Sequence, residues 1–187
     1  MTITAVLLAA GRSTRFGAAD KLTAALGDRP LGLHAAHALA PLDLAARFVV
    51  TGPAESEWPS FEIVDNDRPE DGMAHSIALG IAAARRSSAD AVLIALADMP
   101  FVPTAHFERI LAGYRGPDTL VATSNGVRRM PPALFGSDWF AELEGLSGDR
   151  GAHALLGRAA IVVTEADTLL DVDRPEDLAL AQALLNH

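Results

Sequence analysis

The sequence predicts an α/β fold in which helices cover both faces of a mostly parallel sheet. Strand-like and helix-like segments alternate along the chain, the pattern of parallel strands joined by helical crossovers. Residues 3–10 and 91–97 are apolar almost throughout, as in central strands buried on both faces. The 187 residues, 50% of them hydrophobic, can fill one good core but are short for two. We therefore expect a single domain spanning residues 1–187.

The strand predictions rest on short apolar runs bounded by glycine, proline or polar residues. They cover residues 3–9, 47–51, 61–64, 91–97, 119–123 and 160–164. Ligands of open parallel sheets bind at the carboxyl ends of the strands. The residues that directly follow these runs are therefore the first candidates for a functional site.

The helix predictions rest on residue spacing and on end signals. A proline at the start favours the first helix, and Ile77, Ile81 and Ala84 recur at helical spacing in the second. Asp173 is a candidate N-cap for the last. The predicted helices cover residues 30–40, 73–86, 103–114, 138–146, 151–158 and 175–185.

The composition excludes several classes of protein. A net charge of −9 and 5% aromatic residues argue against nucleic-acid binding, and no apolar run reaches the roughly 18 residues of a membrane span. The absence of cysteine excludes disulfides and cysteine zinc sites and is consistent with a cytoplasmic protein. The apolar segment Ala5–Gly11 is not expected to be a signal peptide, because no positive charge precedes it.

The first predicted strand runs into a loop that combines glycine with positive charge. The loop reads Gly11-Arg12-Ser13-Thr14-Arg15-Phe16-Gly17, and Lys21 follows. Glycine lets backbone N–H groups approach a phosphate, while arginine and lysine supply charge for oxyanions. The spacing matches neither the P-loop of NTPases nor the dinucleotide-binding fingerprint. We interpret the loop as a polyphosphate site, with a solvated surface loop as the alternative.

Aspartates follow two later strand-like segments. Asp98 comes directly after the run 91–97, and Asp173 follows residues 168–172. Mg²⁺ prefers one or two carboxylates together with phosphate oxygens and water. Asp98 and Asp173 are therefore candidate Mg²⁺ ligands beside a bound triphosphate, with Asp171 as the other candidate for the second ligand. A lone aspartate in such a place is otherwise a helix cap or a turn residue.

Together these segments resemble the molybdenum cofactor cytidylyltransferase branch of the nucleotidyltransferases, which is related to the molybdopterin guanylyltransferases. The resemblance runs from the first strand to the last helix, with the motifs in the family's order. The motifs are Leu8-Ala9-Ala10-Gly11-Arg12-Ser13-x-Arg15-Phe16-Gly17-x-x-x-Lys21-Leu22, Gly72-Met73-Ala74-His75-Ser76-Ile77-x-x-Gly80, Ala97-Asp98-Met99-Pro100, Leu146-Ser147-Gly148-Asp149-Arg150-Gly151-Ala152 and Asp171-Val172-Asp173-Arg174-Pro175-Glu176-Asp177-Leu178. The resemblance implies a Rossmann-like three-layer α/β/α sandwich of the nucleotide-diphospho-sugar transferase type.

The same resemblance implies how the nucleotide is held. The base would meet the backbone of the first motif, and the nucleoside would be covered by the second. Lys21, Arg15 and Asp98 would be the catalytic residues, with Lys21 stabilising charge on the α-phosphate. The nucleotide-binding residues implied are Ala9, Ala10, Gly11, Arg12, Ser13, Arg15, Lys21, Gly72 and Ser76.

The resemblance further implies Asp98 and Asp173 as Mg²⁺ ligands and Asp149 as an acceptor-binding residue; the alternative for Asp149 is a cap of the helix predicted to begin near Gly151. Arg129 is expected near the acceptor side, where it could bind an anionic pterin phosphate; a solvated hairpin is the alternative. Two departures fall on that side of the site. Met130 stands where family members commonly have histidine, and His75 stands where a small residue is more usual.

The activity implied is transfer of CMP from CTP to the terminal phosphate of molybdenum cofactor, with release of pyrophosphate. Two alanines before Gly11 are the family's cytidine-type pattern, whereas guanylyltransferases tend to have Ala-Gly-Gly. Alternatives are an enzyme of the same fold that uses GTP or another acceptor (a sugar phosphate or a phospholactate-like compound) and a non-catalytic carrier of nucleotide or molybdopterin. A transient contact with a molybdoenzyme or its chaperone is also expected.

Overall fold

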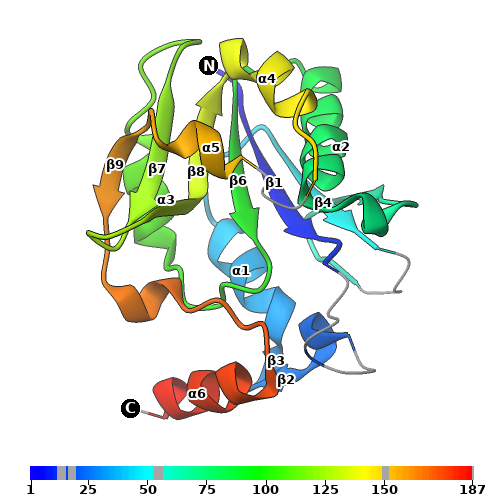
Figure 1. The fold of residues 1–187 in the computed structure, drawn as a ribbon, viewed down its shortest axis with the longest axis vertical. Helices are drawn as coiled ribbons and strands as arrows, with labels where there is room; N and C mark the ends of the chain where they lie inside the picture. The colour runs from blue at the N-terminus through cyan, green and yellow to red at the C-terminus, as the bar shows by residue number, and fades with distance from the viewer. Residues whose placement is uncertain (12–15, 17–19, 53–56, 149–151, 187) are drawn as a thin grey trace.

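A seven-stranded sheet forms the centre of the fold in the computed structural model, which describes residues 1–11, 16, 20–52, 57–148 and 152–186 (Figure 1). Its strands are β1 (Ile3–Ala9), β4 (Ala46–Thr51), β5 (Glu62–Asp65), β6 (Ala91–Leu96), β7 (Leu120–Ser124), β8 (Arg129–Gly136) and β9 (Ala160–Val163). They lie in the order β5-β4-β1-β6-β8-β7-β9. The first strand in the sequence is therefore near the middle of the sheet.

The sheet is parallel except for one strand. β1 pairs in parallel with β4 and β6, β4 with β5, and β7 with β9, whereas β8 runs antiparallel to β6 and β7. The prediction of a mostly parallel sheet is confirmed. β1, β4 and β6 all end at the same edge, the lower one in Figure 1, where Ala9 pairs with Thr51 and Leu8 with Leu96.

Helices form a layer on each face of the sheet. Successive residues of β1 point to opposite faces, so Ala5 and Leu7 belong to one buried cluster and Val6 and Leu8 to the other. The first cluster includes side chains of α1 (Leu31–Leu39), α3 (Thr104–Leu111) and α6 (Pro175–Leu185). The second includes side chains of α2 (Met73–Arg86), α4 (Phe140–Glu144) and α5 (His153–Leu156). This is the expected three-layer α/β/α arrangement.

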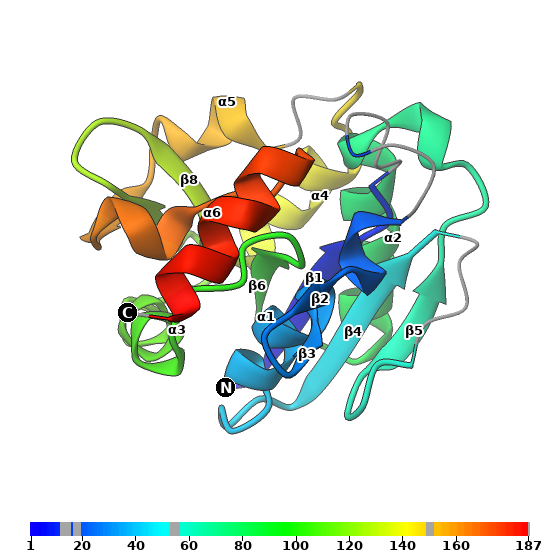
Figure 2. The ribbon, with the colours of Figure 1, turned by 90° about the horizontal axis from the view of Figure 1, so that it is seen from below.

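A small hairpin lies below the carboxyl edge of the sheet. Its strands, β2 (Ala25–Leu26) and β3 (Arg29–Pro30), pair antiparallel. The side-chain amide of Gln182 in α6 donates to the carbonyl of Ala25 at 3.3 Å. Figure 2 shows α6 and this hairpin over the same edge of the sheet.

The sequence analysis missed β8 because Pro131 and Pro132 interrupt its pattern, and proline normally argues against a central strand. The pairing of β8 with β6 covers only Ala133–Gly136. Against β7, the register shifts between Ala122, which pairs with Ala133, and Thr123, which pairs with Met130. Both prolines therefore lie in an irregularity where neither has to donate to the ladder.

The helices otherwise follow the predictions, with differences at their ends. Residues 73–86 and 175–185 are helical as predicted, whereas α4 and α5 are shorter than the predicted segments 138–146 and 151–158. A short 3₁₀ turn, Ser137–Trp139, precedes α4. Among the helices that the structure describes, none has the length and apolar character needed to cross a bilayer.

Candidate active site

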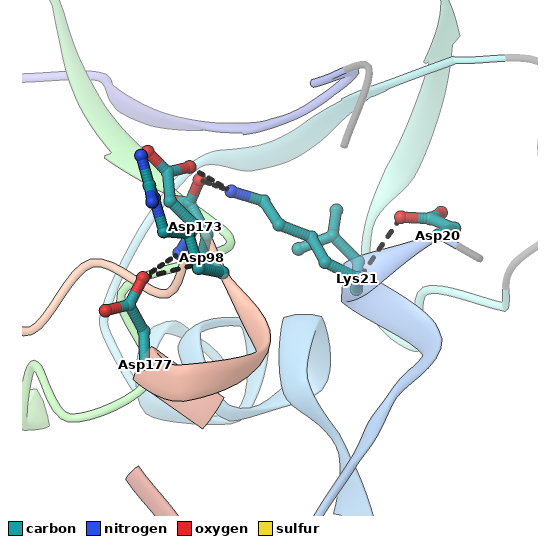
Figure 3. Close-up of polar contacts among 7 residues, drawn as sticks. Asp20, Lys21, Asp98, Asp173 and Asp177 are labelled. Atoms are coloured by element: carbon teal, nitrogen blue, oxygen red, sulfur yellow. Dashed lines mark hydrogen bonds and ion pairs between the residues drawn. The ribbon is translucent and has the colours of Figure 1, made fainter. Parts of the chain in front are cut away.

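Lys21 joins two aspartates that are remote from it in the sequence (Figure 3). Its Nζ donates to Asp98 Oδ2 and to Asp173 Oδ1, each at 2.8 Å. The Lys21 side chain is only 6% exposed. It is also the single lysine of the chain, whose other 14 basic residues are arginines. The three side chains form one ionic cluster at the carboxyl edge of the sheet, with a buried ammonium between two partly exposed carboxylates.

Local backbone structure brings each member to this cluster. Lys21 opens a 3₁₀ turn, Lys21–Thr23, that is capped by the Asp20 carboxylate, which accepts from Leu22 N–H at 3.0 Å. Asp98 follows β6, and its carbonyl accepts from Val172 N–H at 3.0 Å. That backbone bond fixes the segment before α6 against the loop after β6, and so places Asp173 beside Asp98.

Asp173 is not the N-cap of the last helix, and the prediction that gave it this role is wrong. The N-cap residue is Arg174. The Asp177 carboxylate, from the first turn of α6, accepts from the backbone N–H groups of Asp173 and Arg174 at 3.0 and 2.8 Å. The capping is thus done by Asp177, which leaves the Asp173 side chain directed at Lys21.

The cluster keeps Lys21 charged. Burial alone lowers the pKa of an ammonium group, but the carboxylates of Asp98 and Asp173 more than offset this, and the net effect is a raised pKa for Lys21. The site therefore contains a buried cation held by two anions. Each of these three groups would be left as an uncompensated buried or half-buried charge if its partners moved away.

A third carboxylate extends the cluster. Asp98, Asp171 and Asp173 can each present one oxygen such that the three oxygens lie within 4.8 Å of one another. Although Asp171 is exposed, desolvation at the cluster, together with the charges of Asp98 and Asp173, raises its pKa to about 7. The sequence analysis left open whether Asp171 or Asp173 is the second metal ligand, and the structure places both beside Asp98.

This donor set fits a divalent cation. Mg²⁺ binds oxygen ligands at about 2.0–2.1 Å, so ligand oxygens around one ion lie at most about 4 Å apart. Three oxygens that all lie within 4.8 Å of one another need little or no movement to meet this condition. Asp98 Oδ1 is buried and has no hydrogen-bond partner among the residues that the structure describes. Asp98, with Asp171 or Asp173, could therefore hold Mg²⁺ after a small adjustment of side chains.

The proposed nucleoside side lies at the start of α2. Gly72, which precedes the helix, has a φ of +82° that favours glycine. The Ser76 hydroxyl is buried and accepts from the side-chain amide of Asn66 at 3.0 Å. Asn66 was missed by the sequence analysis, although its place just after β5 was a usable signal. The carbonyl of Gly148 accepts from Ala74 N–H at 3.2 Å, which joins this segment to the fourth motif.

The backbone predicted to meet the base lies where β1 ends. Ala9 is the last residue of β1 and pairs with Thr51 of β4. Ala10 is buried, whereas Gly11 is exposed. A Cβ added at Gly11 would meet no atom within 4 Å among the residues that the structure describes. Arg12, Ser13 and Arg15 lie outside the described residues.

On the acceptor side, Arg129 contacts the protein itself. Its Nη1 donates to the carbonyl of Leu156 at 3.1 Å and to the carbonyl of Gly157, at the end of α5. Neither of these partners was anticipated from the sequence. Met130 packs partly buried against the cluster on the α1 and α3 face. Asp149 lies outside the described residues.

A cavity of about 390 Å³ lies between the sheet, α2 and α5. Its walls come from β1, β6, β8 and these two helices, and they include Leu8, Ile77, Leu96, Ala133 and Leu156. Leu8 directly precedes Ala9, and Leu96 is two residues before Asp98. The cavity therefore adjoins the edge of the sheet at which the ionic cluster lies, and it is lined mainly by apolar side chains.

Fold and site together define a nucleotidyltransferase. The chain belongs to the MobA-like NTP transferase domain family, whose family model matches residues 5–164. A crystal structure of Rv0371c from Mycobacterium tuberculosis H37Rv in complex with manganese superposes with a TM-score of 0.82. It shares 24% identity and covers 98% of this chain and 99% of that chain.

Two curated relatives are similar to the chain over nearly its whole length. The purine catabolism protein PucB of Bacillus subtilis (strain 168) is 31% identical over 201 residues, which cover 97% of this chain and 96% of that protein. A molybdenum cofactor guanylyltransferase of Cereibacter sphaeroides is 28% identical over 190 residues, which cover 99% and 98%. The family resemblance deduced from the motifs is thereby confirmed.

Proposed function

We propose that this nucleotidyltransferase transfers CMP from CTP to the terminal phosphate of molybdenum cofactor and releases pyrophosphate. The observation that carries the proposal is the Lys21–Asp98–Asp173 cluster, in which one ammonium contacts two carboxylates. It combines a buried cation for phosphate oxygens with carboxylates suited to a divalent metal ion. A protein that only carried a nucleotide would not need both.

The reaction needs positioning and charge neutralisation more than a protein base. An oxygen of the acceptor phosphate forms a bond to the α-phosphorus of CTP, while the bond from that phosphorus to the bridging oxygen of the β-phosphate breaks. The bridging oxygen keeps the electron pair and leaves as part of pyrophosphate. The acceptor phosphate is already ionised near pH 7, so no proton has to be removed from it. Lys21 is proposed to stabilise the negative charge on the α-phosphate during this step.

Magnesium is the proposed metal ion, held by Asp98 with Asp173 or Asp171. When bound, it supplies Lewis-acid charge that neutralises phosphate oxygens. Arg12, Ser13 and Arg15 are proposed to bind the β- and γ-phosphates. Ala9, Ala10 and Gly11 are proposed to meet the base, with Gly72 and Ser76 over the nucleoside. The hydrogen bond from Asn66 supports this role of Ser76, because it fixes the direction of the hydroxyl.

The preference for CTP rests on Ala9 and Ala10, the cytidine-type pattern before Gly11. GTP is the second candidate, and it is favoured by the name of the Cereibacter relative, a molybdenum cofactor guanylyltransferase.

The name of this relative also supports the proposed acceptor. The cavity between α2 and α5 offers space for an acceptor beside the cluster, and Asp149 is proposed to bind it. We further propose transient contact with a molybdoenzyme or its chaperone during delivery of the product.

The first test measures pyrophosphate release with molybdenum cofactor, Mg²⁺ and each of CTP, GTP, ATP and UTP in turn. Release with CTP alone is the expected result; release with GTP alone would favour the second candidate. Binding of CTP without release under any condition would instead indicate a carrier. A matched control is Arg68→Gln. This change removes a positive charge that forms an exposed ion pair with Asp71, and it should leave turnover unchanged.

A further inference from the structure

We propose that Lys21 acts as an internal counter-ion that keeps free divalent cations out of the Asp98–Asp173 pair and admits a cation only together with a triphosphate. This inference rests on the proposed nucleotide and metal site but not on the identity of the acceptor. It gives Lys21 a role before the chemical step: the site would bind a metal ion that arrives with a triphosphate in preference to a free metal ion.

The first argument is geometric. The Lys21 ammonium lies 2.8 Å from one oxygen of Asp98 and 2.8 Å from one oxygen of Asp173. A Mg²⁺ ion that joined the same two oxygens would sit at about 2.0–2.1 Å from each. Two cations would then share one position between the carboxylates. The ammonium therefore has to leave these oxygens before an ion can bind to them.

The second argument is electrostatic. The Lys21 side chain is 6% exposed, so displacement by a free ion would leave a largely buried ammonium facing a second cation. A buried charge separated from its partners is strongly unfavourable. A free divalent ion therefore has to overcome the existing ion pairs as well as shed part of its own water shell.

A bound triphosphate changes this balance. Its oxygens can pair with the displaced ammonium while the aspartates pair with the metal ion, so each charge keeps a partner. Removal of the ammonium should have the opposite effect on the free ion, because two neighbouring carboxylates attract a cation more strongly when the positive charge of Lys21 is absent. Binding of the metal ion and of the triphosphate are thus expected to be positively coupled through Lys21.

The decisive experiment measures Mn²⁺ binding without nucleotide, by the loss of the free-ion signal in electron paramagnetic resonance. Lys21→Met keeps a side chain of similar length but removes its charge, and it should bind Mn²⁺ at least tenfold more tightly than the wild type. Lys21→Arg keeps the positive charge and should bind Mn²⁺ no more tightly than the wild type. Arg68→Gln removes one positive charge elsewhere and controls for net charge. Circular dichroism confirms that each variant is folded.

A second measurement follows Lys21 in the unaltered protein. Because it is the single lysine, protein labelled with ¹³C at the lysine ε-carbon gives one side-chain signal in NMR. That signal should shift when Mg²⁺ and CTP are added together and stay in place with millimolar Mg²⁺ alone. This measurement does not depend on a variant that retains its fold.

The outcomes separate this inference from the proposed function. Tighter Mn²⁺ binding by Lys21→Met, together with no nucleotide turnover by the wild type, would support the counter-ion role and contradict the proposed activity. Equal Mn²⁺ affinity in Lys21→Met and wild type, or a shift of the lysine signal with Mg²⁺ alone, would overturn the counter-ion role while leaving nucleotidyl transfer intact.

Discussion

The three aspartates of the site differ in what they contact. Asp98 and Asp173 each accept from the Lys21 ammonium. Asp171 lies close enough to share a cation with them, and its pKa is raised to about 7 by desolvation and by their negative charges. The effects of single substitutions on turnover should therefore differ between a carboxylate that contacts Lys21, such as Asp173, and the neighbouring carboxylate of Asp171.

We expect Asp173→Asn to reduce turnover at least 100-fold, and Asp171→Asn to reduce it less than tenfold. The first change removes both an anionic partner of Lys21 and a candidate metal ligand, and the buried ammonium is then poorly compensated. The measurement is kcat and KM for the nucleotide at saturating Mg²⁺. A larger loss in Asp171→Asn than in Asp173→Asn would identify Asp171 as the more important ligand.

At the scale of single elements, α5 depends on a contact from another part of the chain. With four residues, His153–Leu156, it is too short to be stable alone. Arg129, at the start of β8, donates to the carbonyls of Leu156 and Gly157 at its end. Leu156 also lines the cavity beside the site. Arg129 therefore positions one wall of that cavity.

We expect Arg129→Gln to speed amide hydrogen exchange around residues 153–158 and to lower the free energy of unfolding by about 1.5–3 kcal/mol, the range for hydrogen bonds to charged groups. Arg128→Gln is the matched control, because Arg128 is the neighbouring arginine and is exposed. Equal exchange rates in the two variants would argue against a structural role for Arg129. A normal fold with weaker acceptor binding would instead favour the direct contact with the acceptor expected from the sequence.

The packing of α2 on β1 depends on a glycine. A Cβ added at Gly80 would lie 2.4 Å from Val6 Cγ1, well inside van der Waals contact. Glycine at this position allows the helix to approach the central strand closely. The same contact holds the start of α2, with Gly72 and Ser76, in place relative to the end of β1.

We expect Gly80→Ala to destabilise the protein by up to about 2 kcal/mol. Overpacking a core costs about 1–3 kcal/mol, and the preference of a helix for alanine over glycine offsets roughly 1 kcal/mol of that cost. Chemical denaturation measures the change. Combining it with Val6→Ala removes the opposing methyl groups, so the double variant should be less destabilised than the sum of the single changes. Strict additivity would place the strain elsewhere.

At the scale of the whole molecule, a buried polar chain joins α3 to β7 and β8. His106 Nδ1 lies 2.9 Å from Arg109 Nη2, and its Nε2 lies 2.8 Å from Thr123 Oγ1. The Thr123 hydroxyl in turn donates to the carbonyl of Pro132 at 2.8 Å. Because the guanidinium can only donate, Nδ1 accepts and Nε2–H donates to Thr123. The network requires a neutral imidazole.

This requirement predicts a loss of stability in mild acid. Burial, reinforced by the charge of Arg109, lowers the pKa of His106 from 6.5 to about 4. Between these values the unfolded chain binds more protons than the folded one, so stability falls as the pH drops through this window. The loss from this residue reaches up to about 3 kcal/mol near pH 4. Urea denaturation at several pH values, with wild type and His106→Asn, measures it.

The slope of stability against pH between 4 and 6.5 should be shallower in His106→Asn than in the wild type. His37→Asn is the control, because His37 is exposed on α1 and takes no part in the His106 network. The same slope in all three proteins would mean that His106 is not held neutral in the folded state.

Local pattern was sufficient for much of the fold. The apolar runs at β1 and β6 predicted buried parallel strands, and helical spacing predicted α2 at its observed bounds. Both signals depend only on neighbouring residues. The expectation that Asp98 and Asp173 lie close together also followed from the order of the elements, and both contact Lys21. The same local pattern did not predict β8. Its two prolines are accommodated by a shift of register against β7, and this shift becomes visible only when the two strands are paired.

By itself, the sequence determined the class of fold, the family and the residue types available for phosphate and metal chemistry. The tertiary structure decided how these residues pair. Lys21 meets Asp98 and Asp173 across 77 and 152 residues of chain, a contact that no local spacing encodes. It depends on the capped turn at Asp20 and on the backbone bond between Val172 and Asp98. The pairing follows from burial, because an ammonium removed from water is stable only where the fold brings it carboxylates.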